Sequence, residues 1–305
     1  MLGKSLIVAA CLCLLSACAL PRRCASSVLF DEASPAGFPP DIRYYAANWH
    51  ALHRRVSREL QRLRRVSPDG KIDVLALSGG GAVGAFGAGA LIGLSRRGER
   101  PDFQIVTGVS TGALIAPFAF LGSGWDPELA DAFSGARGRS LLHHHWLRRL
   151  LSPGNYETTP LFKLVNHYVT LRLLHAVARQ AARGRLLEIA TTDVDKEETV
   201  IWNMGAIASR GDEAARELFR DVLVASASVP GVFPPVMLRV REGGVTYDEM
   251  EVDGAASAPF IAAPESLFLS SFQLSDLRGG RVFILVNGKL ASEPSTTPFR
   301  TPSVL

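Results

Sequence analysis

Two glycine-containing turns, each between a β-type segment and a helix-like segment, most constrain the fold of this chain. Residues 72–77 (IDVLAL) lead into SGGGAVGAFGAG and a helical pattern that ends near Arg97. Residues 103–106 repeat the β-type pattern, and GVSTG then opens an apolar helix expected over residues 111–121. This order of strands and helices is typical of parallel strands joined by right-handed crossovers. We therefore predict an α/β fold with a mostly parallel central sheet.

The remaining segments extend this plan into a three-layer α/β/α domain over residues 71–290. Residues 126–185 are expected to be largely helical, and a further helix is expected over residues 219–227. Alternating or continuous apolar patterns bounded by turn residues predict the other strands. These strands are placed at residues 186–191, 199–202, 245–252 and 281–286.

The first residues have the form of an export signal. MLGKSLIVAACLCLLSAC has a lysine, a short apolar run and then small residues, and the run is too short for an ordinary spanning helix. Leu15-Ser16-Ala17-Cys18 resembles the lipobox of bacterial lipoproteins, which implies that residues 1–17 are removed and that Cys18 is lipidated. We therefore expect a lipid-anchored protein of the cell envelope, in the outer membrane of a Gram-negative bacterium.

The segment between this anchor and the domain divides into two parts. Residues 18–41 are rich in Pro, Ala and Ser and are predicted to form a tether. Residues 42–70 show apolar side chains at helical spacing and many arginines, which predicts a basic amphipathic helix. That helix either packs on the domain or lies on anionic headgroups. Residues 291–305 are expected to form a polar tail.

Charge gives little indication of a macromolecular partner. The chain carries 33 Lys and Arg against 29 Asp and Glu, a net charge of +4, and its arginines are spread over several segments. This balance does not predict nucleic-acid binding, whereas attraction to an anionic membrane surface agrees with it.

The turn at Ser110 has the form of a nucleophile elbow. Gly108-Val109-Ser110-Thr111-Gly112 lies between a strand and a helix, and a turn this tight leaves no room for side chains two residues either side of the serine. The serine hydroxyl then projects beyond the sheet, next to the N-terminus of the following helix. We predict Ser110 as a nucleophile.

The first glycine loop is expected to lie beside this elbow, because both follow the carboxyl ends of parallel strands. The backbone N–H groups of Gly79, Gly80 and Gly81 can converge on an anion, which next to an activated serine is the oxyanion of acyl transfer. Gly79-x-Gly81-x-x-Gly84 also fits a dinucleotide fingerprint. That alternative needs a carboxylate at the end of the second strand, where none is present.

A serine nucleophile needs a base, and histidine is a poor candidate here. All seven histidines lie at or before His175, and the consecutive His143, His144 and His145 are interpreted as a solvated cluster rather than a metal site. A carboxylate within hydrogen-bond reach can serve directly. Asp253 ends an alternating segment and precedes small residues, so it is the candidate base. We interpret the competing Asp193 as structural or loop-capping, and we expect neither a metal nor a cofactor.

Together these segments resemble the patatin-like phospholipase family. The motifs that carry the resemblance are SGGGAVG, GVSTG, ASASVPGVFPPV at residues 225–236 and VDGA at residues 252–255. The resemblance implies a Ser110–Asp253 dyad, an oxyanion hole at Gly79, Gly80 and Gly81, and hydrolysis of lipid acyl esters without a metal. Family members usually carry Arg or Lys where this chain has Val83.

Two other interpretations stay open on sequence alone. The Val83 departure agrees with a non-catalytic, lipid-binding or scaffolding lipoprotein that keeps the fold. The small residues Ala225, Ser226, Ala227 and Ser228 suggest a helix end close to the site, and we interpret them as plain helix packing.

Overall fold

The computed structural model describes residues 33–47, 62–63, 71–134, 156–258 and 279–288. The predicted signal peptide, the lipidation site Cys18, the polar tail and the histidine cluster at 143–145 lie outside these residues. So does most of the predicted basic helix. Among the described residues, no helix has the length and apolar character needed to cross a lipid bilayer.

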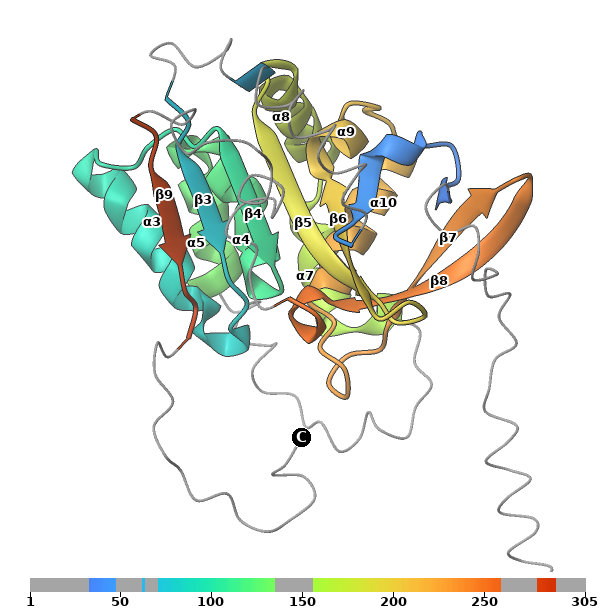
Figure 1. Cartoon of the computed structure of the whole chain (residues 1–305). Coiled ribbons are helices and arrows are strands. Elements are labelled where there is room, and N and C mark those ends of the chain that lie inside the picture. The colour runs from blue at the N-terminus through green and yellow to red at the C-terminus, as the bar shows by residue number, and fades with distance from the viewer. Residues whose placement is uncertain (1–32, 48–61, 64–70, 135–155, 259–278, 289–305) are drawn as a thin grey trace, which may run out of the picture.

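A nine-stranded mixed sheet forms the centre of the described molecule (Figure 1). Its parallel core consists of β9 (Val282–Leu285), β3 (Val74–Leu77), β4 (Ile105–Val109) and β5 (Leu186–Asp193), in that order. The other half is antiparallel. It contains β6 (Glu198–Asn203), β7 (Val236–Glu242), β8 (Val245–Asp253) and the short strands β1 (Ser34–Pro35) and β2 (Arg43–Tyr45).

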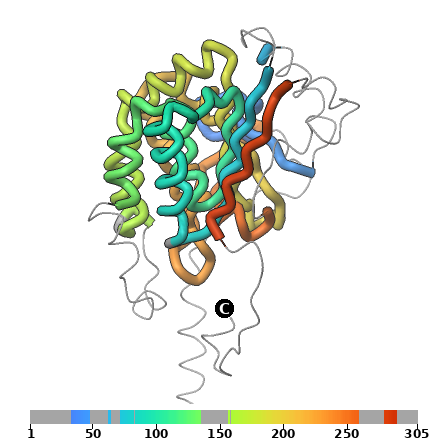
Figure 2. Tube along the Cα trace, turned by 90° about the vertical axis from the view of Figure 1, so that its left-hand side faces the viewer, coloured from blue at the N-terminus to red at the C-terminus, as the bar shows by residue number. Residues whose placement is uncertain are grey.

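Helices flank this sheet, and an edge-on view shows several of them gathered against it (Figure 2). The longer ones are α3 (Ala85–Arg97), α4 (Thr111–Leu121), α5 (Asp126–Ser134), α7 (Pro160–Tyr168), α8 (Leu171–Ala182) and α10 (Glu213–Ser226). The shorter ones are α9 (Met204–Ala208), η1 (Pro40–Ile42), η2 (Gly81–Gly84), η3 (Ser123–Trp125), η5 (Tyr156–Thr158) and η6 (Gly254–Ala256). The predicted α/β class with a mostly parallel core is confirmed.

The core lies between the sheet and these helices. Helix α4 is apolar along nearly its whole length, and its residues from Thr111 to Phe120 are almost all buried. Helices α8 and α10 are amphipathic, with caps from Thr170 and Asp212 that accept hydrogen bonds from the first turn. Each of these two helices therefore buries one face and exposes the other.

The structure differs from the sequence prediction near the N-terminus. Ser34–Pro35 pairs with β7 and Arg43–Tyr45 pairs with β6, although these residues were assigned to a tether and to the start of a helix. Tyr44 and Tyr45 are buried at 8% and 4% exposure. The sequence does not predict β7 either, which begins directly after Pro234 and Pro235. The short N-terminal strands extend the sheet at two separate places.

Candidate active site

The backbone at Ser110 is bent into a conformation that few residues adopt. Its φ is 55° and its ψ is −125°, and Glu197 is the one other non-glycine residue with positive φ among those described. Such a conformation is strained and occurs where surrounding structure enforces it. A Cβ at Gly108 would lie 2.7 Å from the Gly112 carbonyl oxygen, so the glycines predicted for the elbow are required by close backbone approach.

Strand β5 brings the two predicted dyad residues together. Strand β4 runs along one edge of β5 until Val109 pairs with Ala190. Strand β8 comes along the same edge from the opposite direction, until Asp253 pairs with Thr191. The two strands therefore end head to head, and the residues at their ends, Ser110 and Asp253, become neighbours.

The side chains of these two residues form a short hydrogen bond. The Ser110 hydroxyl donates to Oδ2 of Asp253 at 2.5 Å, and both residues are buried, at 4% and 2% exposure. The other carboxylate oxygen of Asp253 accepts the backbone N–H of Ala255 at 2.8 Å, which orients the carboxylate. Burial raises the pKa of Asp253, while the hydrogen bonds from Ser110 and Ala255 lower it in part.

The glycine loop lies directly beside Ser110. A Cβ at Gly79 would lie 3.1 Å from the Ser110 Cβ, and the Thr111 hydroxyl donates to the Gly81 carbonyl at 2.9 Å. Among the described residues, the backbone N–H groups of Gly79 and Gly80 have no acceptor. The N–H of Gly81 starts η2 and so has none within that helix. These three groups are free to donate to a bound anion.

Two polar residues that the sequence prediction did not assign to the site hold this geometry. Oγ of Ser226 accepts the backbone N–H of Ser110 at 3.1 Å and donates to the Ala190 carbonyl at 2.6 Å. The interpretation of Ser226 as plain helix packing was therefore incomplete. Asn287, at 1% exposure, donates its side-chain and backbone N–H groups to Ser78 and accepts the N–H of Gly87. Its backbone lies so close to Gly80 that a Cβ there would overlap it.

The described histidines lie elsewhere. A ring nitrogen of His175 contacts the Gly211 carbonyl at 3.2 Å, and the ring of His167 packs edge-on against Tyr168. Asp193 caps the turn that follows β5, as the sequence predicted, because its Oδ1 accepts the backbone N–H of Asp195 at 2.9 Å. The dyad geometry in the described residues is thus a serine with a carboxylate.

A mostly apolar cavity of about 310 Å³ opens at Ser110. Its walls come from the glycine loop and helices α3, α4, α5 and α7, together with the segment after α10. The lining residues are Gly81, Ala85, Ser110, Thr111, Leu114, Ala132, Phe133, Leu161, Leu164, Ala227, Val229, Val232 and Phe233. A cavity of this size and chemistry suits an apolar group attached to a polar reacting centre.

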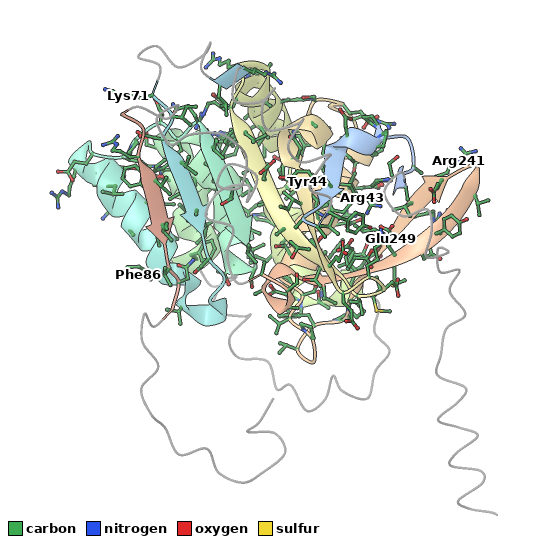
Figure 3. The ribbon with its side chains drawn as sticks, in the orientation of Figure 1. Arg43, Tyr44, Lys71, Phe86, Arg241 and Glu249 are labelled. Atoms are coloured by element: carbon green, nitrogen blue, oxygen red, sulfur yellow. The ribbon has the colours of Figure 1, made fainter. Side chains whose placement is uncertain are left out.

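Buried carboxylates form a second cluster, on the antiparallel half of the sheet. Asp193, Glu249 and Glu251 place carboxylate oxygens within 4.8 Å of one another. The Arg43 guanidinium binds both oxygens of Glu249, and Figure 3 shows these two residues close together. Burial raises the pKa of Glu251 to about 8. Arg43 and a proton on Glu251 thus offset part of the negative charge in this cluster.

Comparison with known proteins assigns the family. The family model for patatin-like phospholipases matches residues 75–264, which include the glycine loop, the elbow and Asp253. The chain belongs to the patatin-like phospholipase family. This membership confirms the family resemblance of the sequence motifs, and it favours hydrolysis over dinucleotide binding at the glycine loop.

Other comparisons give more distant matches. Among solved structures, the chain is similar to the crystal structure of VipD from Legionella pneumophila, at 14% identity and a TM-score of 0.38. That match covers 65% of this chain and 49% of the VipD chain, so this chain spans about half the length of the VipD chain. No curated protein matches.

Proposed function

We propose that this patatin-like protein is a serine hydrolase of lipid acyl esters that uses Ser110 as nucleophile and Asp253 as base. The 2.5 Å hydrogen bond between Ser110 Oγ and Asp253 Oδ2, beside free backbone donors and an apolar cavity, carries the proposal. Family membership supports lipid hydrolysis as the class of activity.

The reaction follows from these positions. The Ser110 Oγ attacks the ester carbonyl carbon as its proton passes to Asp253, and the carbonyl oxygen becomes an oxyanion. The N–H groups of Gly79, Gly80 and Gly81 stabilise that oxyanion, at roughly 3 to 4 kcal/mol for each donor. When the intermediate collapses, the C–O bond to the alcohol breaks and Asp253 returns the proton to the leaving oxygen. Water then attacks the acyl-enzyme with Asp253 again as base, which releases the fatty acid and restores Ser110.

The surface around the cavity supports action at a lipid surface. Nine large apolar residues are well exposed among those described, and four of them line the cavity or lie within two residues of ones that do. These are Val83 and Phe86, at 54% and 61% exposure, and Val229 and Val232, at 38% and 45%. Phe86 is labelled in Figure 3 near the start of α3. Exposed apolar side chains on segments that line a pocket suit contact with lipid.

The dyad is tested by comparing wild type with Ser110→Ala and Asp253→Asn on mixed bacterial lipids, with products identified by mass spectrometry. Both variants are expected to release no fatty acid above background, and a fluorophosphonate is expected to label wild type on Ser110. Asp248→Asn is the matched control, since it lies on the same strand away from Ser110. Absence of label on folded wild type would point instead to a non-catalytic, lipid-binding member of the family.

Action at a membrane is tested separately from chemistry. Phe86→Ser and Val83→Ser are expected to lower hydrolysis of vesicle lipids while changing hydrolysis of a soluble short-chain ester little. Val245→Ser is the control, because Val245 is exposed at the other end of β8. Equal effects on both substrates would contradict the lipid-contact role.

Anchoring through Cys18 predicts that Cys18→Ala moves the protein out of the outer-membrane fraction.

A further inference from the structure

One buried asparagine ties together both ends of the glycine loop. The Nδ2 group of Asn287 donates to the Ser78 carbonyl at 2.9 Å, and its Oδ1 accepts the backbone N–H of Gly87 at 3.0 Å. Ser78 directly precedes Gly79, and Gly87 lies in the first turn of α3. A single carboxamide therefore links the residue before the three glycines to the helix that follows them.

The backbone of Asn287 adds two further restraints on the same loop. Its N–H donates to Oγ of Ser78 at 2.8 Å, and that hydroxyl donates to the Gly79 carbonyl at 2.7 Å. Its carbonyl leaves no room for a side chain at Gly80. Two of the three proposed oxyanion donors thus belong to residues that Asn287 restrains, Gly80 by direct contact and Gly79 through Ser78.

Strand β9 contributes little to the core but brings this asparagine to the loop. It lies at the edge of the sheet, and its Val282 and Ile284 are 46% and 51% exposed, whereas Asn287 is 1% exposed. The parallel register with β3 carries the chain past the end of that strand to Ser78. Burying a carboxamide is costly unless hydrogen bonds satisfy it, and here the glycine loop supplies those bonds.

We propose that Asn287 is a positioning residue of the hydrolase, which holds the N–H groups of Gly79 and Gly80 in place for the oxyanion that forms at Ser110. The inference rests on the proposed hydrolase function and adds a residue to it. Donors that are fixed before the reaction stabilise developing charge without a cost of reorganisation. Asn287 acts through the loop and does not contact the reacting atoms.

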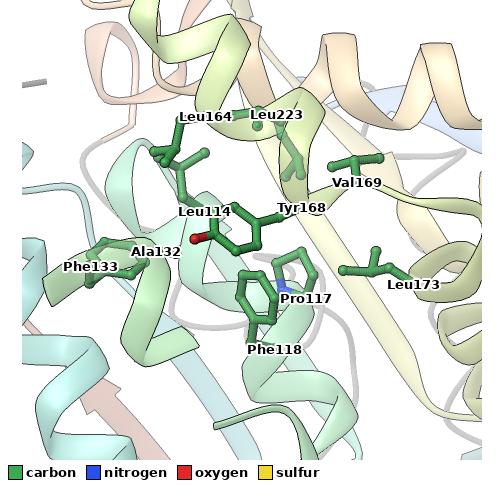
Figure 4. A pocket seen from close by; sticks show the side chains of 11 residues that line it. Leu114, Pro117, Phe118, Ala132, Phe133, Leu164, Tyr168, Val169, Leu173 and Leu223 are labelled. Carbon is green, nitrogen blue, oxygen red and sulfur yellow. The ribbon is translucent and has the colours of Figure 1, made fainter. Parts of the chain in front are cut away.

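The walls of the Ser110 cavity come from other elements. Leu114 of α4, Phe133 of α5 and Leu164 of α7 line it, and Figure 4 shows their side chains. Asn287 does not belong to that lining. Loss of its side chain is therefore expected to weaken stabilisation of the transition state and to change binding of the intact ester little.

The test measures kcat and KM on p-nitrophenyl butyrate. For Asn287→Ala, kcat is expected to fall roughly 10- to 100-fold with KM nearly unchanged, because misplacing a donor costs less than removing one. Asn203→Ala is the matched control, since Oδ1 of Asn203 also accepts a first-turn N–H, but that of α9. A fall in kcat no larger than that of Asn203→Ala would overturn the proposal.

A transition-state analogue separates positioning from a loss of active protein. An alkyl trifluoromethyl ketone accepts Ser110 Oγ at its carbonyl carbon as the hydroxyl proton passes to Asp253, and the resulting oxyanion occupies the same N–H groups. Its inhibition constant is expected to rise in Asn287→Ala by the factor by which kcat/KM falls. A permanently inactive fraction would lower kcat and leave this constant at the wild-type value, and that result would contradict the proposal.

A second variant decides the question if Asn287→Ala does not fold. Asn287→Asp keeps the shape of the side chain, but an ionised carboxylate cannot donate to the Ser78 carbonyl, whereas a protonated one can. The ratio of its kcat to the wild-type kcat is therefore expected to rise as the pH is lowered from 10 toward the acid limb of the wild-type profile. A ratio that does not change over this range would overturn the proposal.

The outcomes also separate the two proposals. If wild type cleaves no ester and a fluorophosphonate does not label Ser110, the hydrolase function fails. If wild type is labelled and active while the Asn287 variants keep its kcat, only the positioning role of Asn287 fails.

Discussion

Ser226 is the side chain that most directly fixes the backbone of Ser110. Ser226→Ala removes the acceptor of the Ser110 N–H and the donor to the Ala190 carbonyl, so two buried groups lose a partner. We expect kcat to fall about tenfold or more, equivalent to at least roughly 1.4 kcal/mol, with little change in KM. Ser228→Ala is the matched control, because the Ser228 hydroxyl donates to Val224 and not to the elbow. Equal kinetics in the two variants would contradict this positioning role.

The raised pKa of Asp253 predicts how activity depends on pH. Asp253 accepts a proton from Ser110 only as a carboxylate, so activity requires a pH above its pKa. Because burial raises that pKa from the ordinary 3.8, the acid limb of kcat/KM is expected at a higher pH than for an exposed aspartate. A pH profile of wild type, with slope one on the acid side, checks this. An acid limb centred at or below 3.8 would contradict it.

Individual site residues can be predicted from the sequence where the proposed reaction requires a recognisable motif. Ser110 could be predicted from the elbow, and Asp253 from the VDGA motif that carries part of the family resemblance. Ser226 and Asn287 could not, because each acts through a hydrogen bond to a backbone group far away in sequence. Asn287 contacts Ser78 over 209 positions, and nothing in the local pattern around it indicates that contact.

Among the elements, strand identity was easier to predict than strand pairing. The segments that became β3, β4, β5 and β8 were recognised, since apolar residues and turn residues mark them. The sequence did not predict that β4 and β8 lie along the same edge of β5. That arrangement depends on which residues of the strands pair, and the individual segments do not specify the pairing. The sequence did not predict β1, β2 and β7. Strands β1 and β2 are short and pair with strands distant in sequence, whereas β7 pairs with the adjacent β8 but directly follows two prolines.

Strand β8 carries a buried acid whose protonation links stability to pH. The pKa of Glu251 is raised to about 8 by burial, whereas its ordinary value is 4.5. Between these values the unfolded chain has released the proton that the folded chain keeps, so stability falls as pH rises. We expect Glu251→Gln to remove a slope of about 1.4 kcal/mol per pH unit in this window. The variant is therefore more stable than wild type near pH 7, measured by denaturant unfolding.

The same experiment contains its own control. Below about pH 4.5, Glu251 is protonated in both states, so the gain from Glu251→Gln is expected to be smallest there. Glu198→Gln is the comparison variant, because Glu198 is partly exposed on β6. A stability difference between wild type and Glu251→Gln that is constant from pH 4 to pH 8 would contradict the assigned protonation.

Across the whole molecule, one buried ion pair joins the N-terminal segment to the antiparallel half of the sheet. Arg43 lies on β2, and its guanidinium binds both the Glu249 carboxylate of β8 and the Ala33 carbonyl. Both side chains of the pair are 2% exposed. Residues 33–45, assigned to a tether and a helix start from sequence, thus belong to the folded domain. Arg43 lies at the start of the segment predicted to form a basic amphipathic helix, but the structure places it in the core.

Removing this arginine is expected to destabilise the whole domain. Arg43→Met leaves Glu249 buried without its partner, close to Asp193 and Glu251, and such a loss costs about 3 to 5 kcal/mol. The double variant Arg43→Met, Glu249→Leu removes both charges and is expected to recover most of that loss. Arg239→Met is the control, because the Arg239 side chain is 76% exposed and its ion pair with Asp248 is long, at 4.0 Å. An exposed ion pair of this kind contributes little to stability. Denaturant unfolding measures all three variants, and an Arg43→Met variant as stable as the double variant would contradict the predicted cost of leaving Glu249 unpaired.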